Sequence, residues 1–137
     1  MQFSTLGVCV HTDDVPAVRA FYTDVLGFAV TLDLGWFVSL RAAGHDDLDL
    51  CVVHRDHTLV PEAGQPVRGV VLAFLVGDVP AEHARLAALG VPVDVPPRDE
   101  PWGQRRCLVR DPAGTGIELV QVTAPDPAWL AEHASSA

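Results

Sequence analysis

The sequence contains no lysine, and its nine basic residues, all arginine, face eighteen acidic residues. The formal net charge at pH 7 is therefore −9. A chain this acidic is poorly suited to the phosphate backbone of a nucleic acid or to an anionic membrane surface. We expect neither as a partner. A cationic ligand is compatible with the charge, although solubility alone would also account for it.

Long hydrophobic runs are also missing. No apolar stretch approaches the roughly 20 residues that a membrane-spanning helix needs. The start of the chain, MQFSTLGVCV, has neither the basic residues nor the small-residue cleavage site of a secretory signal. We therefore expect a single cytoplasmic domain, since 137 residues are enough for one ordinary hydrophobic core.

Cysteines are few and widely spaced, at Cys9, Cys51 and Cys107. No CxxC pair occurs, so the spacing supports neither a zinc knuckle nor a dithiol redox site. Each cysteine lies inside an apolar run, which predicts buried, reduced thiols in strands.

One stretch of the sequence occurs twice. The motif Asp14-Val15-Pro16-Ala17 returns sixty-four positions later, from Asp78, and the copies stay parallel over some seventeen residues. Each copy follows an apolar run, begins a predicted helix with Asp and Pro, and ends in Leu-Gly. One supersecondary unit used twice is predicted. Two such halves facing each other would form a cleft lined by equivalent positions.

Each half predicts the order strand, helix, strand, strand, strand. The strands are expected at 5–11, 28–33, 35–42, 47–54, 70–76, 91–95, 104–110 and 116–122. The helices are expected from Asp13 or Asp14 to Gly27 and over 79–89, with a Pro-rich loop at 95–103. The predicted class is α+β: two tandem βαβββ modules, at 5–57 and 69–123, in one curled eight-stranded mixed sheet with a central cleft. A linker at 58–68 and a short C-terminal helix at 126–134 complete the domain.

These modules resemble a known superfamily in two further segments. They are the helix end from Phe21-Tyr22 to Leu26-Gly27-Phe28 and the stretch WGQR…DPAGTGIEL, from Trp102 to Leu119. Both are similar to the vicinal oxygen chelate superfamily, which groups glyoxalase I, extradiol dioxygenases and bleomycin-resistance proteins. The resemblance covers nearly the whole chain and implies the fold. It does not imply one activity, because this fold carries lyases, isomerases, dioxygenases and non-catalytic drug binders.

The resemblance also implies where a metal would be held. Enzymes of the superfamily usually bind one divalent metal through the first and last strands of both modules, at positions that correspond here to Gly7, Asp49, Val71 and Glu118. Glycine and valine offer no ligating side chain. Two carboxylates without imidazoles are a weak site for zinc, nickel or iron(II). We predict no metal, no other cofactor and no catalytic residue.

Strand alternation places further side chains in the predicted cleft if Gly7 and Glu118 face it. Cys9 and His11 follow from the first strand, and Cys51 follows from Asp49. The resemblance implies a binding role for His11. A histidine ligand displaced from the usual positions is the open alternative, whereas His54 and His57 are interpreted as solvated loop side chains.

Tryptophans are the other candidates for ligand contact. Trp102 lies in a Pro/Gly-flanked loop, where burying an indole is difficult, and Trp36 lies on a middle strand. Trp129 is interpreted as a packing residue. In bleomycin-resistance proteins, tryptophans at similar places stack on flat rings of the drug, and aromatic faces also attract cations. Either Arg105 or Arg106 faces the cleft, where a cation would compensate the carboxylate of Glu118.

Three hypotheses for function follow. The first is non-catalytic sequestration of a bulky natural-product antibiotic, bleomycin-like or another aromatic DNA-damaging drug, by a homodimer; this confers resistance. The second is an enzyme of the same fold: a metal-dependent lyase, epimerase or dioxygenase with displaced ligands, or a metal-free isomerase with Glu118 or His11 as base. The third is an interaction module with an empty cleft. The missing metal ligands, the acidic charge and the position of Trp102 favour the first.

Overall fold

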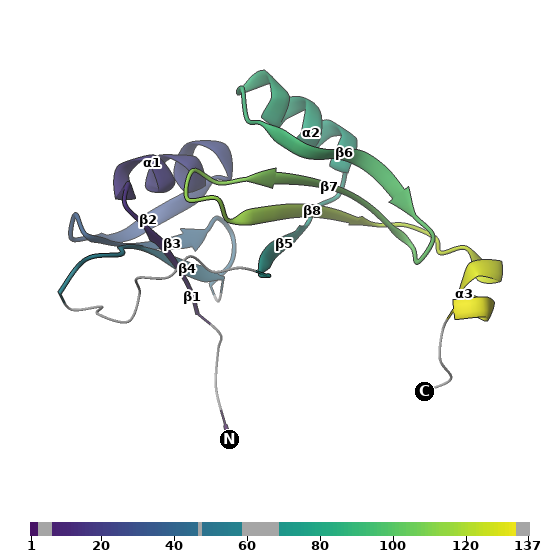
Figure 1. Ribbon diagram of the computed structural model, residues 1–137, viewed down its shortest axis with the longest axis horizontal. Coiled ribbons are helices and arrows are strands. Elements are labelled where there is room, and N and C mark those ends of the chain that lie inside the picture. Colours follow the sequence, from purple (N-terminus) through teal and green to yellow (C-terminus); the bar gives the residue numbers. More distant parts are fainter. Residues whose placement is uncertain (3–6, 47, 59–68, 134–137) are drawn as a thin grey trace. The chain divides into compact units, whose positions relative to one another are not determined.

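The computed structural model describes residues 1–2, 7–46, 48–58 and 69–133, which fall into two compact units. The first unit comprises Met1–Gly69 together with Asp111–Thr115, and the second comprises Val70–Arg110 and Gly116–Ala137. Each unit contains one βαβββ module (Figure 1). The predicted linker at 58–68 lies outside the described residues except for Thr58.

The first helix begins where the DVPA motif predicts. Helix α1 spans Val15–Ala20, and the Asp14 carboxylate caps it by accepting a hydrogen bond from the backbone N–H of Ala17. The chain then continues as a π-helical turn, η1, over Phe21–Val25 and leaves through Gly27 with φ of 78°. Phe21 and Tyr22 are both buried at this turn, although regular helical spacing predicts only one of them.

The first unit's sheet has the strand order β1-β4-β3-β2. Its strands are β1 (Val8–Thr12), β2 (Phe28–Asp33), β3 (Phe37–Ala42) and β4 (Asp49–His54). Strands β1 and β4 are parallel, and the other neighbours are antiparallel. Helix α1 packs on β3 and β4, where Val38, Leu40, Leu50 and Val52 form the core. The opposite face of this sheet is its open face.

The second unit repeats the pattern with the order β5-β8-β7-β6. Its elements are β5 (Val71–Leu75), α2 (Val79–Ala88), β6 (Val93–Glu100), β7 (Gln104–Arg110), β8 (Gly116–Val122) and α3 (Pro127–His133). Asp78 caps α2 through the N–H of Ala81, and Gly90 ends it with φ of 74°. Helix α2 packs on β6, β7 and β8, over a core that includes Leu86, Val109 and Ile117.

Strand β6 corrects one prediction. Residues 95–103 were expected to be a Pro-rich loop, but the strand continues to Glu100. A strand can contain proline when it lies at a sheet edge, because an edge strand has backbone N–H groups that need no partner. Strand β6 is such an edge, and its pairing with β7 shifts register between Val95 and Arg98, around the two prolines.

The predicted class is confirmed: the fold is α+β, with two βαβββ modules. The eight strands form two four-stranded mixed sheets. Residues 5–6 of the first predicted strand, residue 47 and residue 134 of the last predicted helix lie outside the described residues. No helix in the described part of the chain is long and apolar enough to cross a membrane.

Candidate functional site

The open face of the second sheet carries a charged cluster, and strand register decides which arginine joins it. Glu118 on β8 lies opposite Leu108, so alternation places Arg106 on the same face and Arg105 on the other. Arg106 Nη1 donates to Glu118 Oε1 at 2.7 Å. Arg105 instead pairs with Asp99. Arg106 is therefore the arginine that compensates Glu118, a choice that counting along the sequence left open.

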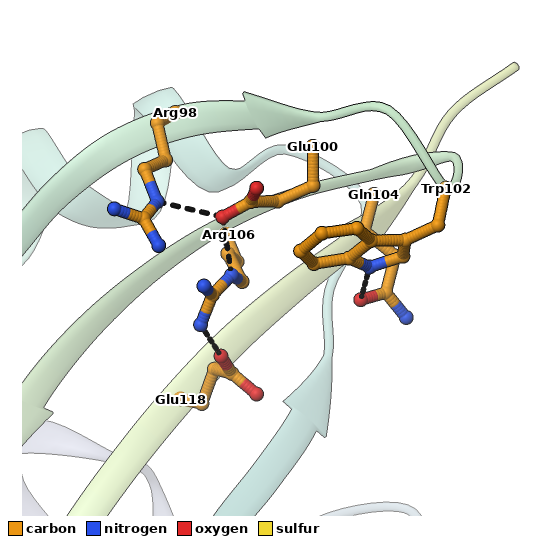
Figure 2. A network of polar contacts seen from close by, with 6 residues as sticks. All are labelled: Arg98, Glu100, Trp102, Gln104, Arg106 and Glu118. Carbon is orange, nitrogen blue, oxygen red and sulfur yellow. Dashed lines mark hydrogen bonds and ion pairs between the residues drawn. The ribbon is translucent and has the colours of Figure 1, made fainter. Parts of the chain in front are cut away.

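Arg106 connects two carboxylates. Its Nε donates to Glu100 Oε1 at 2.7 Å, and Arg98 Nε donates to the same oxygen at 2.6 Å. Figure 2 shows the resulting chain of charges from Arg98 through Glu100 and Arg106 to Glu118. Charge-assisted hydrogen bonds of this kind fix side-chain positions well. The four residues, here called the charge cluster, contain two cations and two anions, so their charges balance.

Glu100 stays ionised within the charge cluster. Its side chain is only 11% exposed, and the resulting desolvation favours the neutral acid. The hydrogen bonds from Arg106 and Arg98 together outweigh that effect and hold the pKa of Glu100 below its ordinary value. Glu100 is therefore ionised at neutral pH and has no carboxyl proton with which to serve as an acid.

Trp102 lies at the turn between β6 and β7, beside the charge cluster. Its indole Nε1–H donates to Gln104 Oε1 at 2.8 Å, and the Arg106 guanidinium carbon is 5.7 Å from its ring centroid (Figure 2). Because Arg106 belongs to the open face, the indole leans over that face. The side chain of Trp102 is nevertheless 42% exposed. One surface of the ring is thus held in position and accessible.

Trp129 extends this aromatic group and corrects a second prediction. It was interpreted as a packing residue, but helix α3 has no buried residue. The ring centroids of Trp129 and Trp102 are 6.0 Å apart. The Trp129 ring also stacks on the His133 ring, with 4.4 Å between the centroids. A seven-residue helix near the chain end cannot cover an indole completely. Trp129 therefore adds aromatic surface next to Trp102.

Gly103 positions both tryptophans. Its N–H donates to Glu100 O, and its carbonyl accepts from Thr123 N at 2.9 Å; next to it, Asp126 N donates to Pro101 O. These bonds attach the segment before α3 to the β6–β7 turn. Gly103 has φ of 95°, and a Cβ there would lie 3.0 Å from Thr123 O and 3.1 Å from Pro125 N. Both the backbone angle and the space require glycine.

Gly103→Ala is therefore expected to move the segment that carries Trp129 away from Trp102. The expected result is a change in tryptophan fluorescence and near-UV circular dichroism, with destabilisation of about 1 kcal/mol or more. Gly44→Ala is the matched control, because Gly44 also has a positive φ, of 78°, but a Cβ there meets none of the described atoms within 4 Å. Equal spectral changes in the two variants would contradict the positioning role.

Apolar side chains surround the charge cluster on the open face. Val71 and Leu75 of β5 and Val122 of β8 share the face of Glu118 by register, and they are 49%, 75% and 70% exposed. Exposed aliphatic groups on the same sheet face as the charge cluster favour contact with an apolar molecule.

The predicted site residues of the first unit also lie on an open face. Register places Cys9, His11, Asp49 and Cys51 on the side of the first sheet opposite α1. Gly7 precedes β1 and is exposed; a Cβ there meets none of the described atoms within 4 Å. Two hydrogen bonds from Arg41 hold both oxygens of Asp49, and these bonds keep the pKa of Asp49 below its ordinary value. His11 is half-buried, and its Nδ1 has no hydrogen-bond partner among the described residues.

The cysteines differ from their predicted state. Only Cys107 is buried as expected, whereas Cys51 is half-buried and Cys9 is exposed. An apolar run predicts a strand, but a strand in a one-sided sheet buries only alternate residues. Cys9 lies on the uncovered side.

Trp36 is placed differently from Trp102. It lies just before β3, and its ring stacks on the His57 ring at 3.8 Å, nearly parallel. The ring centroid of its neighbour Phe37 is 5.7 Å from that of Trp36. His57, interpreted from the sequence as a solvated loop residue, is thus part of an aromatic stack. One face of the Trp36 indole is occupied within the protein.

The residues at the superfamily's metal positions do not fit a metal ion. Gly7 and Val71 have no donor atoms in their side chains. Both oxygens of Asp49 accept hydrogen bonds from Arg41, and Glu118 is paired with Arg106. Among the described residues, no group of three histidine, cysteine, aspartate or glutamate side chains is arranged to hold a metal. We derive no catalytic step through a metal at these positions.

Four residues of this site were missed in the sequence: Arg98, Glu100, Gln104 and Trp129. Three of them lie in or beside the segment 95–103, where the prolines predict a loop and not a strand with alternating faces. Arg98 and Glu100 are two residues apart and would share one face of a strand, and this spacing is the sequence pattern that could have predicted them.

Comparison with known proteins agrees with this fold. The sequence profile of the Glyoxalase/Bleomycin resistance protein/Dioxygenase superfamily matches residues 6–119. The chain therefore belongs to this superfamily. No curated protein sequence matches the chain.

Solved structures with a similar fold carry different functional names. TnmS3, an antibiotic binding protein from Streptomyces sp. CB03234, is 30% identical with a TM-score of 0.70, over 90% of this chain and 99% of that one. Lactoylglutathione lyase from Agrobacterium tumefaciens is 25% identical with a TM-score of 0.69, over 86% and 92%. A superfamily member from Nocardioides has a TM-score of 0.74 at 24% identity, over 90% and 85%, which shows the fold alone.

Proposed function

We propose that this protein binds a bulky aromatic natural-product antibiotic without chemical change and confers resistance by sequestering it. The observation that carries the proposal is the half-exposed indole of Trp102, anchored beside Trp129 and the charge cluster. A rigid, exposed aromatic surface binds flat rings at low entropic cost, because little side-chain freedom remains to be lost.

The charge cluster supports a binding role more than a catalytic one. Glu100 and Glu118 both accept hydrogen bonds from Arg106, so neither is an unoccupied general base. Aliphatic groups of β5 and β8 next to the cluster would contact the rest of a large ligand. Similarity to the antibiotic binding protein TnmS3 supports the same class of ligand.

The remaining predicted contacts belong to this proposal. The ligand contacts proposed on the second unit are Trp102, Arg106 and Glu118. Those proposed on the first unit are His11, Cys9, Gly7, Asp49, Cys51 and Trp36. Arg105 faces the other side of its sheet and is left out. We further propose that the protein acts in the cytoplasm as a homodimer, since a partner would cover the exposed sheet faces.

An enzyme of the same fold is the second candidate, favoured by the similarity to a lactoylglutathione lyase. The two proposals predict different responses to chelation. A binding protein retains its ligand in EDTA, because no metal takes part. A metal-dependent lyase loses activity in EDTA and recovers it when a divalent metal is restored.

The deciding experiment titrates the purified protein with bleomycin and a panel of aromatic-ring antibiotics. Trp102 lies at the proposed site, so we expect saturable quenching of tryptophan fluorescence by at least one compound, with one site per chain and the same Kd in EDTA. Lactoylglutathione lyase activity is assayed in parallel with zinc, nickel and manganese. Turnover that depends on one of these metals, or a panel without any binder, would contradict sequestration.

A further inference from the structure

Two cysteines that are 42 positions apart in the sequence are neighbours in the first sheet. Cys9 of β1 and Cys51 of β4 are paired in the parallel ladder. Paired residues on adjacent strands point to the same side of the sheet, here the open face. The Cys9 thiol is close enough to Cys51 to contribute, together with burial, to the raised pKa of Cys51. The sheet thus creates a dithiol that the sequence spacing does not show.

The geometry of this pair allows a bond between the sulfurs. Adjacent strands are about 4.8 Å apart, and disulfides join Cα atoms separated by roughly 4.4–6.8 Å. Cys9 is exposed and open to a reagent from solvent, whereas Cys51 is half-buried beside it. Cys107 cannot substitute for either one, because it is buried in the second unit on the face toward α2.

A metal is a poorer occupant of this pair. The nearest candidate for a third ligand is His11, two residues after Cys9 on the same face, with Nδ1 unpartnered among the described residues. Within those residues, however, no set of three such side chains has metal-binding geometry. Two thiols alone are better suited to oxidation than to holding zinc, which requires a fuller ligand set.

We propose that Cys9 and Cys51 are a site of reversible oxidation, at which a peroxide converts the two thiols into a disulfide that joins β1 to β4. Cys9 attacks the peroxide through its sulfur; the O–O bond breaks, Cys9 becomes a sulfenic acid, and water leaves. The Cys51 sulfur then attacks the Cys9 sulfur, the S–O bond breaks, and a second water leaves. Overall, two thiols and one hydrogen peroxide give one disulfide and two waters.

The two thiols have different roles for a physical reason. Burial, followed by the interaction with the neighbouring Cys9 thiol, raises the pKa of Cys51 to about 12. Cys51 is therefore protonated at neutral pH and is a poor first nucleophile, because only the thiolate attacks. The exposed Cys9 reacts first, and Cys51 resolves the sulfenic acid next to it. This proposal does not depend on which ligand the protein binds.

The test is peroxide oxidation of the reduced full-length protein, followed by alkylation of free thiols and peptide mapping. Trypsin separates the three cysteines into peptides 1–19, 42–55 and 107–110. We expect a disulfide that links 1–19 to 42–55 within one chain, with Cys107 still alkylated, and complete reversal by dithiothreitol. A link to Cys107, a link between two chains, or no link while Cys9 becomes over-oxidised would overturn the proposal.

Single variants test the order of attack. In Cys51→Ser, the sulfenic acid on Cys9 has no resolving thiol and should be trapped by dimedone. In Cys9→Ser, Cys51 should remain a free thiol under the same conditions. Equal dimedone labelling of Cys51 in Cys9→Ser would overturn the assigned roles. Both variants replace cysteine by serine in a strand, at an exposed position for Cys9 and a half-buried one for Cys51. Circular dichroism confirms folding before each measurement.

Discussion

Trp102→Ala is expected to weaken binding of the aromatic antibiotic more than any other single change in the proposed site. Truncation of an anchored aromatic residue at the centre of a binding surface costs about 2 kcal/mol or more, which is roughly 30-fold in Kd. The reason is geometric: the indole is fixed by Gln104, flanked by Arg106 and Trp129, and still 42% exposed. Isothermal titration calorimetry measures the effect directly.

Two variants control this result. Trp102→Phe keeps a stacking ring without the Nε1–H group and should recover most of the affinity. Leu34→Ala removes an exposed apolar side chain in the first unit, at the turn before β3, and should leave Kd unchanged. If Trp102→Ala binds as tightly as wild type, Trp102 does not belong to the ligand site. If Leu34→Ala weakens binding as much, the loss is not specific to the site.

Tyr22→Phe is expected to produce a large loss of stability in the first unit. The Tyr22 hydroxyl is fully buried and donates to Asp111 Oδ2 at 3.0 Å, and Asp111 is itself only 4% exposed. Burial, reinforced by the carboxylate of Asp111, raises the pKa of Tyr22, so the hydroxyl remains a donor at every ordinary pH. Removing it leaves a buried carboxylate oxygen without that donor and costs about 1.5–3 kcal/mol in the free energy of unfolding.

A double-mutant cycle isolates this hydrogen bond. Asp111 also accepts from Thr115 N at 2.8 Å, so Asp111→Asn retains an acceptor, whereas Asp111→Ala loses both contacts. Urea denaturation of Tyr22→Phe, Asp111→Ala and the double variant should give a coupling energy of about 1 kcal/mol or more. Additive losses would show that the two side chains stabilise the unit independently.

The hydrogen bond accompanies an unexpected feature of the fold. The turn between β7 and β8, Asp111–Thr115, is grouped with the first unit although its strands belong to the second. The sequence predicts this turn correctly from Asp111 and the proline that follows. Nothing in the local pattern indicates that Tyr22, 89 positions away, is its partner.

Local chemistry explains why so much of the fold was predictable. The repeated DVPA motif contains a capping carboxylate and a proline suited to the first helical turn, and Gly27 and Gly90 provide the positive φ at which each helix ends. These preferences act within a few residues. Strands β2, β7 and β8 accordingly have the predicted bounds.

The candidate site was less predictable, because it depends on pairing between strands. Alternation fixes the relative faces of Arg105 and Arg106, but only the register of β7 against β8 shows that Arg106 shares a face with Glu118. Strand β6 was misread because two prolines resemble a loop unless the strand is known to lie at a sheet edge.

The sequence by itself therefore determined the two modules, their helix ends and the absence of side-chain ligands at Gly7 and Val71. Those features follow from residue type and from preferences over a single turn or strand. Tertiary structure alone decided that Trp102 stands beside Arg106, that Glu100 joins Glu118 in one charge cluster, and that Cys9 meets Cys51. Each of these contacts joins separate strands or turns, and the register that creates it is set by packing of the whole sheet.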